Sequence, residues 1–440
     1  MGTPNERVIA CGAGFAGDRT EPAVALAASG FVDAVGLECL AERTLVPGLR
    51  ARRDNPEAGA DPRLDRRLRS LLPVAKANDC RIISNLGAAN PSSAGRQIAR
   101  LASEIGCSGM RVAAVIGDDV MALTEHIDWD EAFTGSLLGA HAYLGADALR
   151  DAVFDGADVI VTGRAADSAL FSAEALPILE DNLDALAGAT TIGHLLECSG
   201  QVTGGNFEMP DGSSLSARDF ADLGFPLAHV YPDGTAKITL LDGAPGRIDP
   251  LVCTLQLLYE VHDPSAYITP DAILDFTGIS FEQVGPNQVR VSGAKARGKP
   301  TRLKVSGFVD QPGFVADIEI GYAGTHAMQR GRVAAEALRM RLDDIPEADM
   351  RIDLVGVDST LGAASLPAAN RMPEVRVHIS ARCDDAQMVQ IVEDEVYSLT
   401  LSGPAGGGSV RSERRPSMAV VDGFIDRELV KTEIVWETAS

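Results

Sequence analysis

Short apolar runs alternate with amphipathic segments along the first part of the chain. The apolar runs predict strands at residues 8–11, 32–37, 81–84, 110–116 and 158–162. Between them, apolar positions recur with a helical period, and this pattern predicts helices at residues 21–29, 63–77, 94–105 and 144–155. Strands that are apolar throughout and alternate with helices are typical of a parallel sheet covered on both faces. We therefore expect an α/β fold with a mainly parallel sheet and helices on both faces.

The pattern changes after about residue 285, where strand-like runs of alternating polarity begin. Two helical segments lie among these strands, at residues 327–340 and 387–398. Several strands with two helices predict a smaller α+β domain. We therefore expect two domains. Residues 1–285 form the α/β domain with most of the polar loops, and residues 286–440 form the smaller domain, which contains a glycine-rich loop at 403–408.

Charge and composition narrow the classes of partner. The 440 residues carry a formal net charge of −23, which argues against nucleic acid or an anionic membrane as the partner. A local arginine can still bind a small anionic substrate. No apolar run approaches the ~18 residues of a spanning helix, the first residues lack the layout of a signal peptide, and the cysteines show no paired spacing. We expect a cytoplasmic protein with reduced thiols.

The densest group of polar residues follows the predicted strand at 158–162. Arg164 can form two parallel hydrogen bonds to a carboxylate or a phosphate. Asp167 could be the partner of Arg164, a base, or the cap of the following helix. Because ligands of parallel sheets bind at the carboxyl ends of the strands, this position favours a substrate site.

A second polar cluster lies about thirty residues further on. His194, Glu197 and Cys198 share one face if the segment is helical, and Gln201 follows them. These residue types could bind a metal, pair a thiol with an imidazole, or transfer protons. We favour His194 and Glu197 as proton-transfer groups and assign Gln201 to the substrate site.

Two earlier strand ends also carry polar groups. Glu38 and Glu42 could form an acid–base pair or supply metal ligands. Glu42 could instead only balance the charge of a neighbouring arginine. Asn85 and Asn90 stand in a loop of small residues before Pro91, where amides could orient a carbonyl or form a turn. We count Glu38 among the catalytic candidates and both asparagines among the substrate-binding ones.

The segment Gly12 to Gly17 matches the glycine pattern of a dinucleotide-binding turn, and Glu38 stands about twenty residues beyond it. Asp18 and Arg19 crowd the place where the helix should begin, so a generic loop for an anion or a substrate is favoured. A purely architectural turn stays possible. We assign this loop to substrate binding through Gly14, Gly17, Asp18 and Arg19.

Several short segments match the motifs of a known family and follow one another in the same order. They are Gly14 to Arg19, Ser84 to Pro91, Tyr143 to Ala146, Val161 to Asp167, His194 to Cys198, Gly204 to Phe207, Gln256 to Glu260 and Gly403 to Gly408. Together they resemble the acyclic terpene utilisation family (AtuA type) over nearly the whole chain. The resemblance covers the core region, without the ferredoxin-like domain that longer members add at the C-terminus. It implies a role in the breakdown of acyclic terpenoids through CoA thioesters.

The chain departs from the family pattern at Gly243 to Gly246 and at Leu255, so a different substrate or pathway stays open. Our leading hypothesis is a metabolic enzyme with lyase, hydratase or isomerase chemistry on a carboxylate or acyl-CoA. Arg164 and Arg19 would hold its anionic group, and His194, Glu197 or Asp167 would move a proton. The alternatives are an NAD(P)-dependent oxidoreductase that uses Gly12 to Gly17 and a non-catalytic accessory or assembly subunit.

The sequence carries no specific cofactor signature. We therefore assign no metal ligands, although NAD(P) or a divalent metal stays open. We expect a small-molecule anionic substrate, neither nucleic acid nor membrane as a partner, and a homo-oligomer.

Overall fold

The computed structural model of the chain describes residues 6–209, 211–346, 349–364 and 372–440. It divides into two compact units. The first comprises Met1–Ala132, Leu138–Gly307 and Val421–Ser440, and the second comprises Phe133–Leu137 and Phe308–Val420. Residues 286–307, which the sequence grouped with the smaller domain, belong to the first unit. Among the described residues, no helix is long and apolar enough to cross a membrane.

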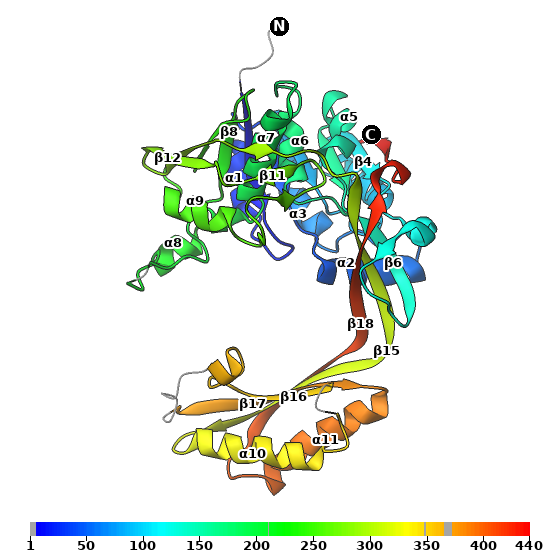
Figure 1. Cartoon of the computed structure of the whole chain (residues 1–440), viewed down its shortest axis with the longest axis vertical. Helices are drawn as coiled ribbons and strands as arrows, with labels where there is room; N and C mark the ends of the chain where they lie inside the picture. Colours follow the sequence, from blue (N-terminus) through cyan, green and yellow to red (C-terminus); the bar gives the residue numbers. More distant parts are fainter. Residues whose placement is uncertain (1–5, 210, 347–348, 365–371) are drawn as a thin grey trace. The chain divides into compact units, whose positions relative to one another are not determined.

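A ten-stranded sheet organises the first unit (Figure 1). Its five central strands are parallel and lie in the order β1 (Arg7–Ala13), β2 (Ala34–Leu37), β3 (Arg81–Ser84), β7 (Val159–Thr162) and β4 (Arg111–Ile116). Antiparallel strands extend both edges. They are β8 (Leu227–Val230), β9 (Ala236–Thr239), β13 (Gln288–Ser292) and β12 (Ser280–Gly285) beside β1, and β19 (Glu433–Thr438) beside β4.

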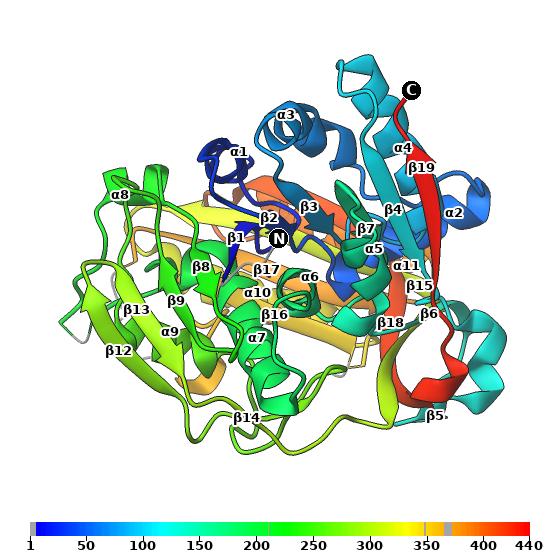
Figure 2. The same cartoon turned by 90° about the horizontal axis from the view of Figure 1, so that it is seen from above.

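The central strands are apolar throughout because both of their faces are buried. Val8 and Ala10 of β1 belong to one core, together with α1 (Glu21–Ala28), α3 (Leu64–Ala77) and α4 (Pro91–Glu104). Ile9 and Cys11 point to the opposite core, with α6 (Ala169–Ala175) and α7 (Leu183–Leu196). Figure 2 shows these two groups of helices on opposite sides of the strands.

The first unit contains further helices and strands. Its helices include α2 (Glu42–Asp54), α5 (Arg150–Phe154), α8 (Ala217–Ala221) and α9 (Pro250–Leu257), with 3-10 turns at Met121–His126, Ala146–Ala148, Ser199–Gln201 and Arg427–Leu429. A small antiparallel sheet contains β10 (Tyr267–Ile268), β11 (Ile273–Asp275) and β14 (Lys295–Ala296). Two further strands are β5 (Asp128–Trp129), which pairs with β18, and β6 (Ser136–Ala142), which pairs with β15.

The described part of the second unit contains, in chain order, β15 (Arg302–Ala323), α10 (Ala327–Arg341), β16 (Met350–Val355), β17 (Glu374–Cys383), α11 (Ala386–Ser402) and β18 (Gly408–Asp426), with a 3-10 turn at Gly362–Ala364. The sheet order β16-β17-β15-β18 and this connectivity define a ferredoxin-like arrangement. Both long helices pack on the same face of the sheet (Figure 1) and share one apolar core with it. Strands β15 and β18 each contribute residues to both units.

The predicted class, a mainly parallel sheet with helices on both faces, is wrong for the chain. Among the strands of the described residues, parallel pairing joins only the five central ones. In the same sheet β8, β9, β12, β13 and β19 pair antiparallel, and β15, β16 and β17 pair antiparallel in the other. The physical reason is that an apolar run reports burial and not strand direction. Strands β8 and β9 are joined by a short turn, and such a connection permits only antiparallel pairing.

Candidate functional site

A cavity of about 700 Å³ lies in the first unit, at the carboxyl ends of its parallel strands. Gly14 follows β1, Glu38 follows β2, and Arg164 and Asp167 follow β7, and all four line this strand-end cavity. The strands are parallel and adjacent in the sheet, so their carboxyl ends bring these loops together. The position agrees with the rule that ligands of such sheets bind outside the carboxyl ends.

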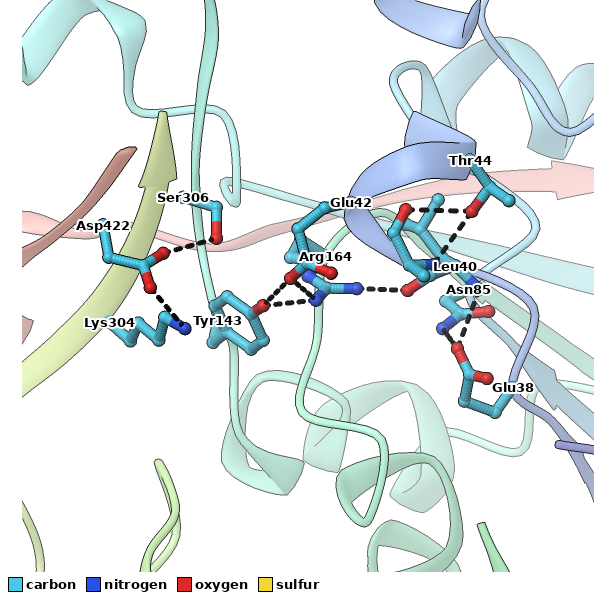
Figure 3. A network of polar contacts seen from close by, with 11 residues as sticks. Glu38, Leu40, Glu42, Thr44, Asn85, Tyr143, Arg164, Lys304, Ser306 and Asp422 are labelled. Atoms are coloured by element: carbon cyan, nitrogen blue, oxygen red, sulfur yellow. Dashed lines mark hydrogen bonds and ion pairs between the residues drawn. The ribbon is translucent and has the colours of Figure 1, made fainter. Parts of the chain in front are cut away.

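Glu38 is a buried carboxyl group at this cavity, and its side chain is held by neutral donors (Figure 3). Its Oε1 atom accepts hydrogen bonds from the Leu40 amide at 2.8 Å and from Asn85 Nδ2 at 3.1 Å. Asn85 is itself oriented by the Cys39 amide, which donates to its Oδ1 at 2.7 Å. Burial raises the pKa of Glu38 to about 7, against the effect of these hydrogen bonds and of Arg164. Glu38 can therefore exchange a proton near neutral pH.

Arg164 joins the loop after β7 to the start of α2 (Figure 3). Its guanidinium donates to the Leu40 carbonyl, to the Tyr143 hydroxyl and, at 2.5 Å, to Glu42 Oε1. The guanidinium carbon lies 4.2 Å from the centre of the Tyr143 ring. Protein acceptors occupy both terminal nitrogens, so Arg164 builds the wall of the cavity and leaves little capacity for a substrate anion.

Glu42 is the acidic partner in this wall. Burial alone would raise its pKa, but the Arg164 charge and the hydrogen bond from Tyr143 lower it below its usual value. Glu42 therefore stays a carboxylate at neutral pH, in contrast to Glu38, and we regard it as a structural anion.

Asp167 brings a second protonatable carboxyl group to the cavity. Its Oδ1 atom is buried and has no hydrogen-bond partner among the described residues. Burial raises the pKa of Asp167 well above its usual value, and the neighbouring Glu38 charge adds to this shift. Asp167 is therefore a candidate acid at neutral pH.

Glu197 and Cys198 reach the cavity from the end of α7. Glu197 Oε1 lies 2.9 Å from His194 Nδ1, and the imidazole lies behind the carboxylate, only 1% exposed and outside the cavity lining. Burial and the Glu197 charge raise the pKa of the Cys198 thiol. The thiol is therefore a poor nucleophile at neutral pH.

The glycine loop after β1 is closed on itself. The Gly14 amide donates to Asp18 Oδ2 at 2.9 Å, so this amide is not available to a phosphate. A Cβ atom at Gly14 would come within 2.6 Å of the Glu197 carbonyl, which explains the glycine by close packing of two loops. Arg19 is not part of the cavity lining, and its guanidinium donates a hydrogen bond to the Ala221 carbonyl at 2.7 Å. The loop geometry does not favour a dinucleotide.

The structure brings part of the predicted set together. The predicted residues that line the cavity are Gly14, Glu38, Arg164, Asp167 and Glu197. Asn85 and His194 support the lining from behind, through Glu38 and Glu197. The predicted residues outside the lining are Gly17, Asp18, Arg19, Asn90 and Gln201, in addition to these two. Asn90 caps α4, because its side chain accepts a bond from the Ser93 amide. The catalytic and binding roles stay predictions.

The predicted set omits several lining residues: Arg43, Tyr143, Tyr259, Glu260, Tyr267, Arg302 and Lys304. Tyr143 and Glu260 stand in segments that the family pattern contains, so that pattern could have found them. Lys304 and Arg302 come from the start of β15 and carry no local motif. Within the described residues, no group of three or more His, Cys, Asp and Glu side chains is arranged to hold a metal ion.

These features define a mixed α/β protein with a carboxyl-lined cavity at the ends of parallel strands. A family model described as acyclic terpene utilisation family protein AtuA matches residues 8–436. The chain belongs to this family, as the sequence resemblance indicated, and the family description supports a metabolic role in acyclic terpene utilisation. No curated protein and no solved structure matches the chain.

Proposed function

We propose that the chain is an enzyme that moves a proton next to a carbonyl group, on a carboxylate or acyl-CoA substrate bound in the strand-end cavity. The observation that carries this proposal is Glu38. It faces the cavity, its neighbours are neutral donors, and its pKa of about 7 suits proton exchange at neutral pH. Lyase, hydratase and isomerase reactions all use such a step.

Three of the carboxyl groups that line the cavity, Glu38, Asp167 and Glu197, support a division of roles. Asp167 has a raised pKa and holds a proton, which it can donate to a developing oxyanion. Glu197 is paired with His194 and can accept a proton from the carbon next to the carbonyl. Glu38 lies close enough to Asp167 and Glu197 for their charges to influence its pKa, so it can return a proton at the end of the reaction.

The rest of the cavity lining supports an amphipathic substrate. Phe15, Tyr259 and Ile268 are 50%, 39% and 66% exposed, and these side chains offer an apolar surface to a hydrocarbon chain. Arg43 has no ion-pair partner among the described residues, and we propose it, together with Lys304, as the direct contact of the substrate anion. Arg164 then supports this site from the wall.

The state of the cysteines supports a cytoplasmic location for this enzyme. All seven are free thiols, as expected in a reducing compartment.

The experiment is a turnover assay with a panel of branched carboxylates and their CoA thioesters, followed by mass spectrometry of the products. We expect Glu38→Gln to lower kcat/KM by about 10²- to 10⁴-fold, the range of general acid–base catalysis. Glu282→Gln is the matched control, because it removes an exposed carboxylate that pairs with Arg290 at 3.0 Å. Equal turnover by Glu38→Gln and the wild type would contradict the role of Glu38. Wild-type protein that converts no member of the panel would contradict the substrate class.

A further inference from the structure

His194 has an acceptor at each ring nitrogen. The Leu257 carbonyl lies 3.1 Å from Nε2 and can only accept, so Nε2 must carry a hydrogen. Glu197 Oε1 lies 2.9 Å from Nδ1, and a carboxylate there also requires a hydrogen on the ring. An imidazolium satisfies both contacts at once, whereas a neutral ring requires the proton to lie on Glu197.

The surroundings of the ring favour the charged form. Leu257 is the last residue of α9, where the helix dipole places partial negative charge. The rings of Tyr267 and Phe276 lie with their centres 5.1 and 5.8 Å from the imidazole and offer their π-electrons to a cation. The charged groups that act on the ring are Glu197 and Glu260, both acidic, and the Tyr267 ring lies against it.

The raised pKa of His194 agrees with this geometry. Burial alone would lower the pKa of His194, but the Glu197 charge and the hydrogen bonds to Glu197 and Leu257 raise it above the usual value. A second contact fixes the backbone, because Gln256 Nε2 donates to the His194 carbonyl at 3.2 Å. The end of α9 thus holds both the ring and the main chain of His194.

We infer that His194 is a positioning residue, a buried imidazolium that fixes Glu197 as the proton acceptor of the cavity. This inference rests on the proposed function, which assigns Glu197 the role of proton acceptor. His194 lies outside the cavity lining, so it acts through Glu197 and touches no substrate. It occupies Oε1 of Glu197 and leaves Oε2 for the reacting proton.

The reaction that this arrangement supports is balanced in protons and electrons. Glu197 Oε2 takes the proton from the carbon next to the carbonyl, and the electron pair of the broken C–H bond moves to the carbonyl oxygen. The protonated Asp167 donates a hydrogen bond to the enolate that forms. Glu38 then gives its proton to another carbon of the substrate, which completes an isomerisation without an oxidant or a reductant. Afterwards Glu197 releases its proton to solvent and Glu38 takes one from solvent. His194 keeps its charge throughout.

The test is a ¹⁵N NMR titration of the histidine rings in the full chain, between pH 6 and pH 8, with the His194 signals assigned by their loss in His194→Gln. We expect both ring nitrogens of His194 to be protonated at pH 7 in the wild type and in the control Glu282→Gln. In Glu197→Gln the ring should become neutral within this range, because its ionic partner is gone. A neutral His194 in the wild type at pH 7 would overturn the inference, and so would an unchanged titration in Glu197→Gln.

A kinetic measurement separates positioning from a merely structural role. We expect His194→Gln to lower kcat by about ten- to hundredfold with little change in KM, and to shift the acid limb of the kcat profile to higher pH. An unshifted pH profile would contradict positioning. The titration needs no substrate, so its result stands apart from the turnover assay. A charged His194 in a protein that converts no substrate would therefore count against the proposed function and not against the charge state.

Discussion

In the folded chain Glu38 keeps its proton at pH values at which a glutamate in water is ionised. Its pKa is about 7, whereas its ordinary value is 4.5, because burial penalises the charged carboxylate. The folded state therefore binds the proton more tightly than the unfolded state does. The stabilising contribution of the protonated group is complete below pH 4.5 and is lost as the pH rises to 7.

The first prediction follows from this pH dependence. Glu38→Gln keeps an oxygen for the bonds from Leu40 and Asn85 but carries no charge, so we expect it to be more stable than the wild type at pH 8, by about 1–3 kcal/mol. At pH 5 most of the difference should disappear. Urea unfolding at both pH values measures the effect. A Glu38→Gln variant less stable than the wild type at pH 8 would contradict the buried-carboxylate account.

The second prediction concerns Cys198. Burial and the Glu197 charge raise the pKa of its thiol, so little thiolate is present at neutral pH. We expect iodoacetamide to modify Cys198 slowly at pH 7.5, and Cys198→Ala to keep most of the turnover. Mass spectrometry of the labelled protein measures the rate of modification. Rapid labelling accompanied by inactivation would instead support a nucleophilic cysteine.

At the scale of elements, Arg164 connects the loop after β7 with the first turn of α2. The third prediction is that Arg164→Ala destabilises the first unit by about 1–3 kcal/mol, because it leaves the half-buried Glu42 and the Leu40 carbonyl without their donor. Arg164→Lys keeps the charge but not the two-armed donor, so we expect only partial recovery. Thermal unfolding of both variants checks this. Full recovery in Arg164→Lys would show that charge alone matters at this position.

The sequence predicts the elements of the first unit better than their pairing. The central strands β1, β2, β3, β4 and β7 are recognisable because two-sided burial makes them apolar throughout. Their flanking partners are not, because the direction of β8 or β19 depends on the path of the chain and not on its apolar pattern. The same limit explains why the apolar pattern predicted a mainly parallel sheet where the observed sheet is mixed.

The same reasoning applies to the cavity. Glu38, Arg164 and Asp167 were predictable because a strand end is visible in the sequence and its loop must lie at the edge of the sheet. Lys304 was not, because β15 brings it to Tyr143 and Asp422 across long separations in the chain. Local patterns also cannot tell an arginine that is free to bind an anion from one, such as Arg164, whose two terminal nitrogens already donate to protein acceptors.

At the scale of the whole molecule, the net charge of −23 opposes the approach of the anionic substrate that we propose. The local attraction of Arg43 acts over a few ångströms, whereas the repulsion is long-ranged and is screened by salt. The fourth prediction is that kcat/KM for an anionic substrate rises by about two- to threefold between 10 and 200 mM NaCl. Arg43→Ala should show the same rise from a lower starting value. A steep fall with salt in the wild type would indicate that the cavity attracts its substrate electrostatically over long range.

The measurement that tests the central claim most directly is the incorporation of solvent deuterium into the substrate. Wild-type protein in D₂O, given an acyl-CoA or carboxylate that it converts, should place deuterium at the carbon next to the carbonyl or at the carbon that receives the proton. Glu197→Gln should abolish this incorporation, and Glu282→Gln should leave it intact. Conversion by the wild type without any deuterium in substrate or product would contradict proton transfer at this cavity.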